Sequence, residues 1–277
     1  MEARALPVPG LAARQLRERA ARLQLRGEFE QAEQLLLRAR RILDRARVRD
    51  ADYASVLNDL GVLWKARGWF EAARAAYRTA LPIFLCARPA DRDTIATLYH
   101  NLGGIEHASG RYATAERLAR RGLSIRRRLP GSNILAIAAD EAALAVILMD
   151  RRKLGASDRL SRHALAAFRR QLGPRHYEIG MLLASRAVLH QVRGHTGAAS
   201  RCYVRSLEIL EAAIGRSHPD VAVTIGHFAV LRAAQGRHVE ADRLYRRALR
   251  ILTRRLGSRN PRTLVVRRNL KRLRGAR

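Results

Sequence analysis

The sequence predicts an all-α protein built from tandem helix pairs, that is, an α-solenoid. A turn marked by glycine recurs along the whole chain, and the apolar residues on either side of it follow helical spacing. Composition agrees, because 48% hydrophobic residues supply a continuous core and argue against disorder. We therefore expect a repeating order of helix, glycine turn, helix and link.

The repeat marker is a glycine that follows a helical stretch and usually precedes an aromatic residue. Successive glycines lie 41, 42, 84 and 42 residues apart. The longest interval spans two periods, and its missing marker falls on an arginine, so the fourth repeat is degenerate at this position. Six repeats therefore occupy the chain. Their markers are Gly27, Gly68, Gly110, Arg152, Gly194 and Gly236.

Prolines support the borders between repeats. Pro219 and Pro261 suit the first turn of a helix, where no backbone N–H is needed. Pro82 instead falls inside a second helix and predicts a kink there. The predicted segments are a loose lead-in over 1–10, repeats over 11–50, 51–90, 91–131, 132–173, 174–216 and 217–258, a capping helix over 260–273 and a basic tail over 274–277, with a single solenoid over 11–273.

Small residues recur at three fixed offsets from the marker, which predicts close approaches between helices. Seven residues before the marker stand Ala20, Gly61, Gly103, Ala145, Ala187 and Ala229. Five residues after it stand Ala32, Ala73, Ala115, Ser157, Ala199 and Ala241. Twelve residues after it stand Ala39, Ala80, Gly122, Ala164, Ser206 and Ala248.

The last repeats carry a specific family resemblance. The link from Gly215 to Asp220, which contains His-Pro-Asp, and the GRHVEADRLYRRAL segment from Gly236 to Leu249 resemble the long-period tetratricopeptide repeat (TPR) of kinesin light chains. The resemblance covers about residues 11–273. It implies a right-handed superhelix of about six helix-turn-helix units whose first helices line a concave groove that binds partner peptides. No heptad coiled coil precedes the repeats, so it does not imply a motor subunit.

When the groove positions of the family are carried over to this sequence one by one, they predict a groove with two kinds of lining residue. The first three repeats contribute a polar, cationic half: Arg14, Arg17, Asn58, Lys65, His100 and His107. The last three contribute an apolar half: Val146, Met149, Met181, Val188, Val223 and Val230. We expect a bound segment with acidic residues on the first half and apolar residues on the second. The alternative is that these aliphatic residues pack against neighbouring helices.

The formal charge of +30 makes nucleic-acid binding the alternative function. Arginine pairs such as Arg246–Arg247 and Arg254–Arg255 could contact phosphates. However, several such pairs lie at the ends of second helices, where cations complement the helix dipole. Most aromatic residues occupy core columns, which leaves few for base stacking. We favour a protein or peptide partner, and the arginine-rich composition fits a coding bias equally well.

The sequence predicts neither catalysis nor a metal or cofactor site. It contains no glycine-rich phosphate loop, nucleophile elbow or paired-carboxylate motif. His100 and His107 lie two helical turns apart, but no carboxylate or cysteine completes a metal site. Cys86 and Cys202 form neither a disulfide framework nor a metal-binding spacing. We therefore expect a non-enzymatic scaffold or adaptor without cofactors.

A membrane-bound or secreted protein is not predicted. The first ten residues lack the apolar core of a signal peptide. The most apolar stretch, 134–149, is interrupted by Asp140 and Glu141. The expectation is a cytoplasmic protein with no membrane partner. Self-association through an exposed edge is a third alternative to peptide and nucleic-acid binding.

Overall fold

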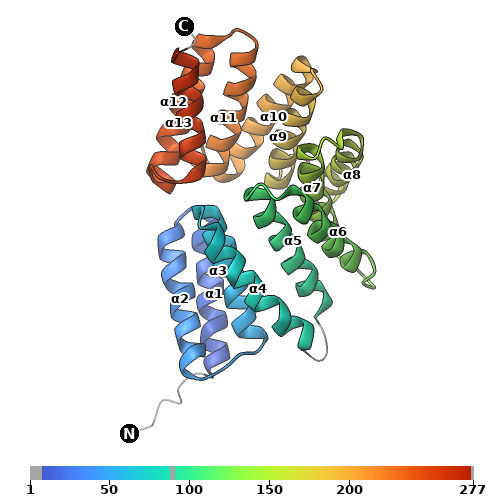
Figure 1. Ribbon diagram of the computed structural model, residues 1–277, viewed down its shortest axis with the longest axis vertical. Coiled ribbons are helices and arrows are strands. Elements are labelled where there is room, and N and C mark those ends of the chain that lie inside the picture. The colour runs from blue at the N-terminus through green and yellow to red at the C-terminus, as the bar shows by residue number, and fades with distance from the viewer. Residues whose placement is uncertain (1–7, 88–90, 276–277) are drawn as a thin grey trace. The chain divides into compact units, whose positions relative to one another are not determined.

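The computed structural model describes residues 8–87 and 91–275, and within these ranges it contains thirteen helices and no strand (Figure 1). The first helices of the six repeats are α1 (Pro9–Leu25), α3 (Ala51–Arg67), α5 (Arg92–Ala108), α7 (Ile134–Asp150), α9 (Tyr177–Val192) and α11 (Pro219–Ala234). The second helices are α2 (Phe29–Arg45), α4 (Phe70–Cys86), α6 (Tyr112–Arg127), α8 (Leu154–Leu172), α10 (Thr196–Ile214) and α12 (His238–Leu256). The capping helix is α13 (Pro261–Gly275). These elements confirm the predicted all-α class of helix pairs with a final capping helix.

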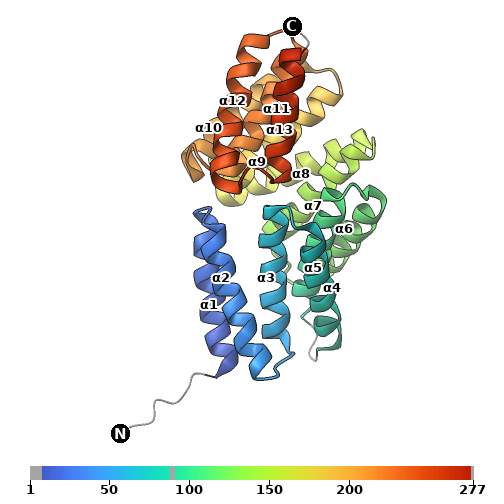
Figure 2. The same ribbon diagram turned by 60° about the vertical axis from the view of Figure 1, so that its left-hand side comes forward.

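The helices form two compact units, and the border between them lies between Ser132 and Asn133. This border coincides with the predicted link between the third and fourth repeats. The N-terminal unit holds α1 to α6, and the C-terminal unit holds α7 to α13. Within each unit every first helix packs against its own second helix and against the first helix of the next repeat, as the second view also shows (Figure 2). The prediction of one continuous solenoid over 11–273 stays a prediction.

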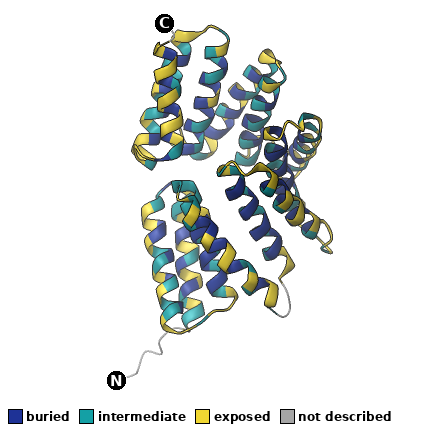
Figure 3. Cartoon of the chain, viewed as in Figure 1, coloured by how far each residue is buried: buried dark blue, intermediate teal, exposed yellow. Residues whose placement is uncertain are grey.

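The small-residue columns provide the closest helix contacts. Every position of the three columns is buried, and buried residues concentrate where paired helices face each other (Figure 3). A Cβ atom added to Gly61 would lie 2.4 Å from Cε1 of Tyr77. One added to Gly122 would lie 2.9 Å from the carbonyl oxygen of Ala96. Small side chains are therefore a steric requirement of the helix pairing.

The repeat markers adopt the left-handed backbone conformation that ends a first helix. The five marker glycines have φ angles between 73° and 84°. Arg152, the marker of the degenerate fourth repeat, has a φ of 59° and adopts the same conformation. The turn is therefore kept in all six repeats, although a side chain with a Cβ makes this conformation costly at Arg152.

Two predicted borders differ from the structure. Helix α1 begins at Pro9, two residues before the predicted border, and α13 continues to Gly275, two residues beyond its predicted end. Pro82 lies inside α4, which remains helical through Cys86, and the kink expected there stays a prediction. Residues 1–7 of the predicted lead-in and 276–277 of the predicted tail lie outside the described residues.

Helix α7 carries the most apolar stretch of the chain, yet Asp140 and Glu141 are buried within it at 4% and 0% exposure. Glu141 is paired with His163 on α8. Among the helices that the structure describes, none combines the length and apolarity needed to cross a membrane.

Candidate binding surface

The predicted polar lining of the N-terminal unit begins with an ion pair between adjacent first helices. Arg14 on α1 donates two hydrogen bonds to Asp52 on α3, with Nε–Oδ1 and Nη2–Oδ2 distances of 2.8 and 3.0 Å. The Arg14 side chain is 62% exposed and the Asp52 side chain only 15%. This guanidinium therefore reaches solvent while it joins the first two repeats.

Two further polar contacts continue across the same first helices. Arg17 on α1 is paired with Asp59 on α3, with a distance of 2.7 Å between Nε and Oδ2. The side-chain amide of Asn101 on α5 donates to the Asn58 carbonyl oxygen of α3 at 2.7 Å. Because each contact joins neighbouring repeats, these polar side chains stabilise the packing of α1, α3 and α5. Arg14 and Arg17 also enter any binding reaction already paired with carboxylates.

The remaining predicted polar residues lie half-buried on α3 and α5. Lys65 extends from α3 towards α5, since a Cβ atom added to Gly104 would lie 2.5 Å from its Nζ atom. The His107 ring lies 5.5 Å from the Tyr112 ring, centroid to centroid. Across residues 8–87 and 91–275, no group of three or more histidine, cysteine, aspartate or glutamate residues could hold a metal ion.

The predicted apolar lining occupies the first helices of the C-terminal unit. Met149 is only 7% exposed, so its side chain serves packing. The others are half-buried: Val146, Met181, Val188, Val223 and Val230. Met181, Val223 and Val230 pack against one buried cluster, and Val188 against another. These four side chains therefore join the core with part of their surface and keep the rest open.

A polar network on the C-terminal unit was not predicted. The Tyr177 hydroxyl of α9 donates to Asp220 on α11 at 2.9 Å, and Arg262 on α13 lies 3.3 Å from the other carboxylate oxygen. Burial, together with the carboxylate of Asp220, raises the pKa of Tyr177 well above its usual value. Asp220 and Asp52 occupy the same offset, sixteen residues before their markers. This shared offset is the sequence signal that could have revealed these contacts between repeats.

Comparison with known protein families decides the identity of the repeat. A family model described as tetratricopeptide repeat matches residues 95–133 and 221–262. These two stretches cover most of the α5–α6 and α11–α12 helix pairs with their glycine turns. The two matched stretches are tetratricopeptide repeats. No curated protein sequence matches it significantly.

Solved structures show the same TPR fold at low sequence identity. BtubC (BKLC) from P. vanneervenii is 22% identical with a TM-score of 0.58, covering 87% of this chain and 91% of the other. Nearly identical TPR-like repeats assigned to a kinesin light chain of Podosopora anserina are 18% identical with a TM-score of 0.55, covering 75% and 98%. A Rap protein in complex with Competence and Sporulation Factor is 12% identical with a TM-score of 0.65, covering 96% and 75%. At these sequence identities the likeness shows that the fold is shared, and it shows nothing more.

Proposed function

We propose that this TPR protein is a non-catalytic scaffold that binds a segment of a partner protein along its first helices. One observation carries the proposal. Side chains on the first helices remain half-exposed in both units, polar on α1, α3 and α5 and aliphatic on α7, α9 and α11. The similar Rap structure supports it, since that TPR-like fold is solved with Competence and Sporulation Factor bound. The proposal keeps the cytoplasmic setting expected from the sequence.

The chemistry of the N-terminal unit shapes the partner that we propose. An acidic partner side chain would share Arg14 and Arg17 with Asp52 and Asp59. Sharing is feasible because a guanidinium has five N–H donors, of which Arg14 uses two for Asp52. The carboxamide of Asn58 both donates and accepts, which suits a peptide backbone. We therefore propose that this unit binds an extended segment with backbone polar contacts and one or two acidic side chains.

The C-terminal unit would bind the apolar part of the same kind of partner. Its five half-buried aliphatic side chains have already lost part of their surface to packing. If binding removed on the order of 100 Å² more, the gain would be roughly 2–3 kcal/mol at about 25 cal/mol per Å². Association entropy exceeds that gain, so affinity must also draw on polar contacts. We expect a dissociation constant in the micromolar range or weaker.

The test is capture of partners from a lysate of the source organism, followed by mass spectrometry. The wild-type protein is compared with Val188→Thr/Val230→Thr on the first helices α9 and α11. The matched control is Val204→Thr/Val239→Thr, two exposed valines on the second helices α10 and α12. All three proteins are first compared by circular dichroism, because threonine keeps the shape of valine but adds a hydroxyl.

The proposal expects a protein that the wild type and the control retain and the first-helix variant loses. Retention after nuclease treatment and at high salt supports burial of apolar surface, which screening leaves intact. Loss of all captured protein after nuclease would instead assign the function to nucleic-acid binding through the positive charge. Equal retention by the two variants would contradict binding along the first helices.

A further inference from the structure

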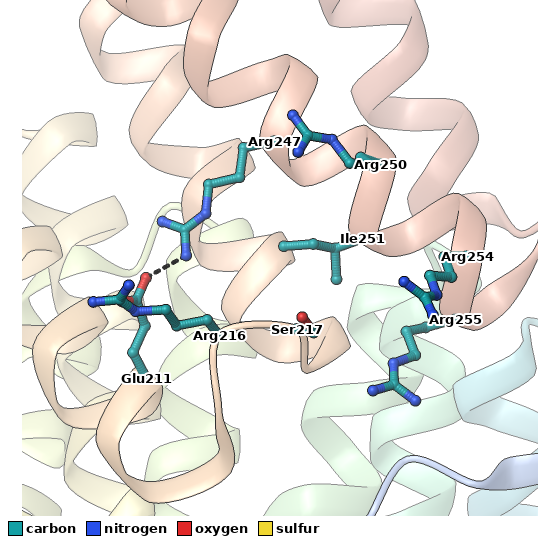
Figure 4. Close-up of a pocket in the computed structure, with 8 residues that line it drawn as sticks. All are labelled: Glu211, Arg216, Ser217, Arg247, Arg250, Ile251, Arg254 and Arg255. Carbon is teal, nitrogen blue, oxygen red and sulfur yellow. Dashed lines mark hydrogen bonds and ion pairs between the residues drawn. The ribbon is translucent and has the colours of Figure 1, made fainter.

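The C-terminal unit contains a pocket of about 810 Å³ between the ends of two second helices (Figure 4). One wall is the last two and a half turns of α12, and the other is the end of α10 with the link that follows it. Five arginines surround this arginine pocket together with one acidic, one hydroxyl and one aliphatic residue. The lining residues are Arg216, Arg247, Arg250, Arg254, Arg255, Glu211, Ser217 and Ile251.

The charges around the arginine pocket are far from balanced. Glu211 accepts a hydrogen bond from Arg247 at 2.6 Å, and its other oxygen lies 3.2 Å from Nε of Arg216. Within residues 8–87 and 91–275, no carboxylate pairs with the three remaining arginines, Arg250, Arg254 and Arg255. A single carboxylate therefore faces five guanidinium groups in one concave site, and an anion entering it meets a strong positive field.

Arginine pairs also end α6 and α8, but not every second helix ends in this way. One period earlier, α10 carries Glu208, Ala212 and Ala213 at the positions of Arg250, Arg254 and Arg255. The last turn of α10 has no basic residue at all. The equivalent helix α10 ends without arginines. The helix dipole alone therefore does not explain the arginines at the end of α12.

The lining indicates which anion fits. Guanidinium groups bind phosphate oxygens through paired N–H donors, and Ser217 adds a hydroxyl that can donate to a further oxygen. None of the eight lining residues is aromatic, so the pocket offers no platform on which a base could stack. Its volume lies in the range of small-ligand sites. We propose that the arginine pocket binds a compact anion carrying two or more phosphate groups.

The test uses tripolyphosphate as the probe and calorimetric titration at physiological salt. The pocket variant is Arg254→Gln/Arg255→Gln, in the last turn of α12. The matched control is Arg169→Gln/Arg170→Gln, which removes two arginines from the last turn of α8. Both variants lower the net charge by the same amount and at the same place in a second helix, so only the pocket distinguishes them.

We expect the pocket variant to bind tripolyphosphate at least about tenfold more weakly and the control to bind within about twofold of wild type. Citrate, which carries similar charge on carboxylates, should bind more weakly than tripolyphosphate. If a doubly phosphorylated peptide displaces tripolyphosphate, the natural ligand is a phosphorylated partner protein. If the peptide does not displace it, the natural ligand is a small molecule.

Two results would overturn the proposal. Equal weakening in both variants would show that tripolyphosphate senses only the overall charge. Binding of a single-stranded oligonucleotide that exceeds tripolyphosphate binding, again with equal weakening in both variants, would assign the arginines to nucleic acid. The arginine pocket lies on second helices, so the proposed partner binding on the first helices stands or falls independently of these outcomes.

Discussion

The guanidinium of Arg14 contacts both carboxylate oxygens of Asp52, at 2.8 and 3.0 Å, and so joins the first helices of the first two repeats. Arg14 is 62% exposed, and exposed ion pairs contribute little to stability because water competes for both groups. The contact therefore matters most for the charge that α1 and α3 present at their surface.

Replacing Asp52 by asparagine should release the Arg14 charge for a partner. We expect Asp52→Asn to change the free energy of unfolding by less than about 1 kcal/mol. The same variant should bind an acidic partner segment more tightly than wild type does, measured by titration with a fluorescent peptide. Asp44→Asn is the control, because Asp44 lies on the second helix α2 and pairs with Arg40 and Arg49, not with Arg14. Unchanged or weaker peptide binding by Asp52→Asn would contradict the role of Arg14.

Substitution by alanine should have opposite effects at a glycine inside a small-residue column and at a glycine outside these columns. Gly61→Ala should destabilise the protein by about 1–3 kcal/mol, because the new Cβ would lie 2.4 Å from the Tyr77 ring. Gly155→Ala should stabilise it by about 0.5–1 kcal/mol, since Gly155 lies in α8 with open space around it and alanine favours helices. Urea denaturation of both variants measures the difference. Equal effects would show that the α3–α4 contact tolerates a larger residue.

Arg152 predicts a gain in stability at the degenerate repeat marker. Its φ of 59° strains a residue with a Cβ but suits glycine. Arg152→Gly should therefore raise the free energy of unfolding by about 1 kcal/mol. Arg151→Gly is the matched control, because Arg151 has a φ of −83° and should gain nothing. A loss of stability in Arg152→Gly equal to that in the control would contradict backbone strain at this turn.

His218 predicts that the protein loses stability under mildly acidic conditions. Its ring nitrogen Nδ1 accepts a hydrogen bond from the Asp220 backbone N–H at 3.2 Å, at the start of α11. Burial lowers the pKa of His218, with Arg255 and Arg262 adding to the effect and Asp220 opposing it. The unfolded chain, whose histidines titrate near about pH 6.5, then takes up a proton before the folded state does. The free energy of unfolding should therefore fall as pH drops through that value.

His218→Asn tests this assignment, because asparagine keeps a side-chain cap and does not titrate. Thermal unfolding of the variant should depend less on pH between about 7.5 and 5.5 than that of wild type. His176→Asn, which changes the exposed cap at the start of α9, is the control for loss of a histidine. If His218→Asn keeps the full pH dependence of the wild type, the dependence comes from other groups.

The periodic parts of this structure could be predicted from sequence because they depend on local rules. Gly61 and Gly122 are small because a neighbouring helix passes close to each of them, and that requirement recurs with every repeat. The turn at Arg152 could be placed by period alone, although its residue type gave no signal. Pro219 and Pro261 begin α11 and α13, as expected for prolines at a first helical turn.

The pairing of side chains across repeats could not be predicted in the same way. Arg14 and Asp52 are 38 residues apart, and their contact depends on how α1 and α3 are displaced along their axes. The same limit explains why the sequence did not reveal the pairing of Arg17 with Asp59. The arginine pocket depends in turn on how the end of α12 packs against the link after α10.

Site-specific photocrosslinking tests most directly whether partners bind along the first helices. A photoreactive residue replaces one of four exposed valines, Val62 on α3, Val192 on α9, Val204 on α10 or Val239 on α12, and the protein is irradiated in a lysate of the source organism. We predict that one and the same partner protein crosslinks from Val62 and Val192 and not from Val204 and Val239. Crosslinks to a partner from Val204 or Val239, with none from the first helices, would contradict the proposed binding surface.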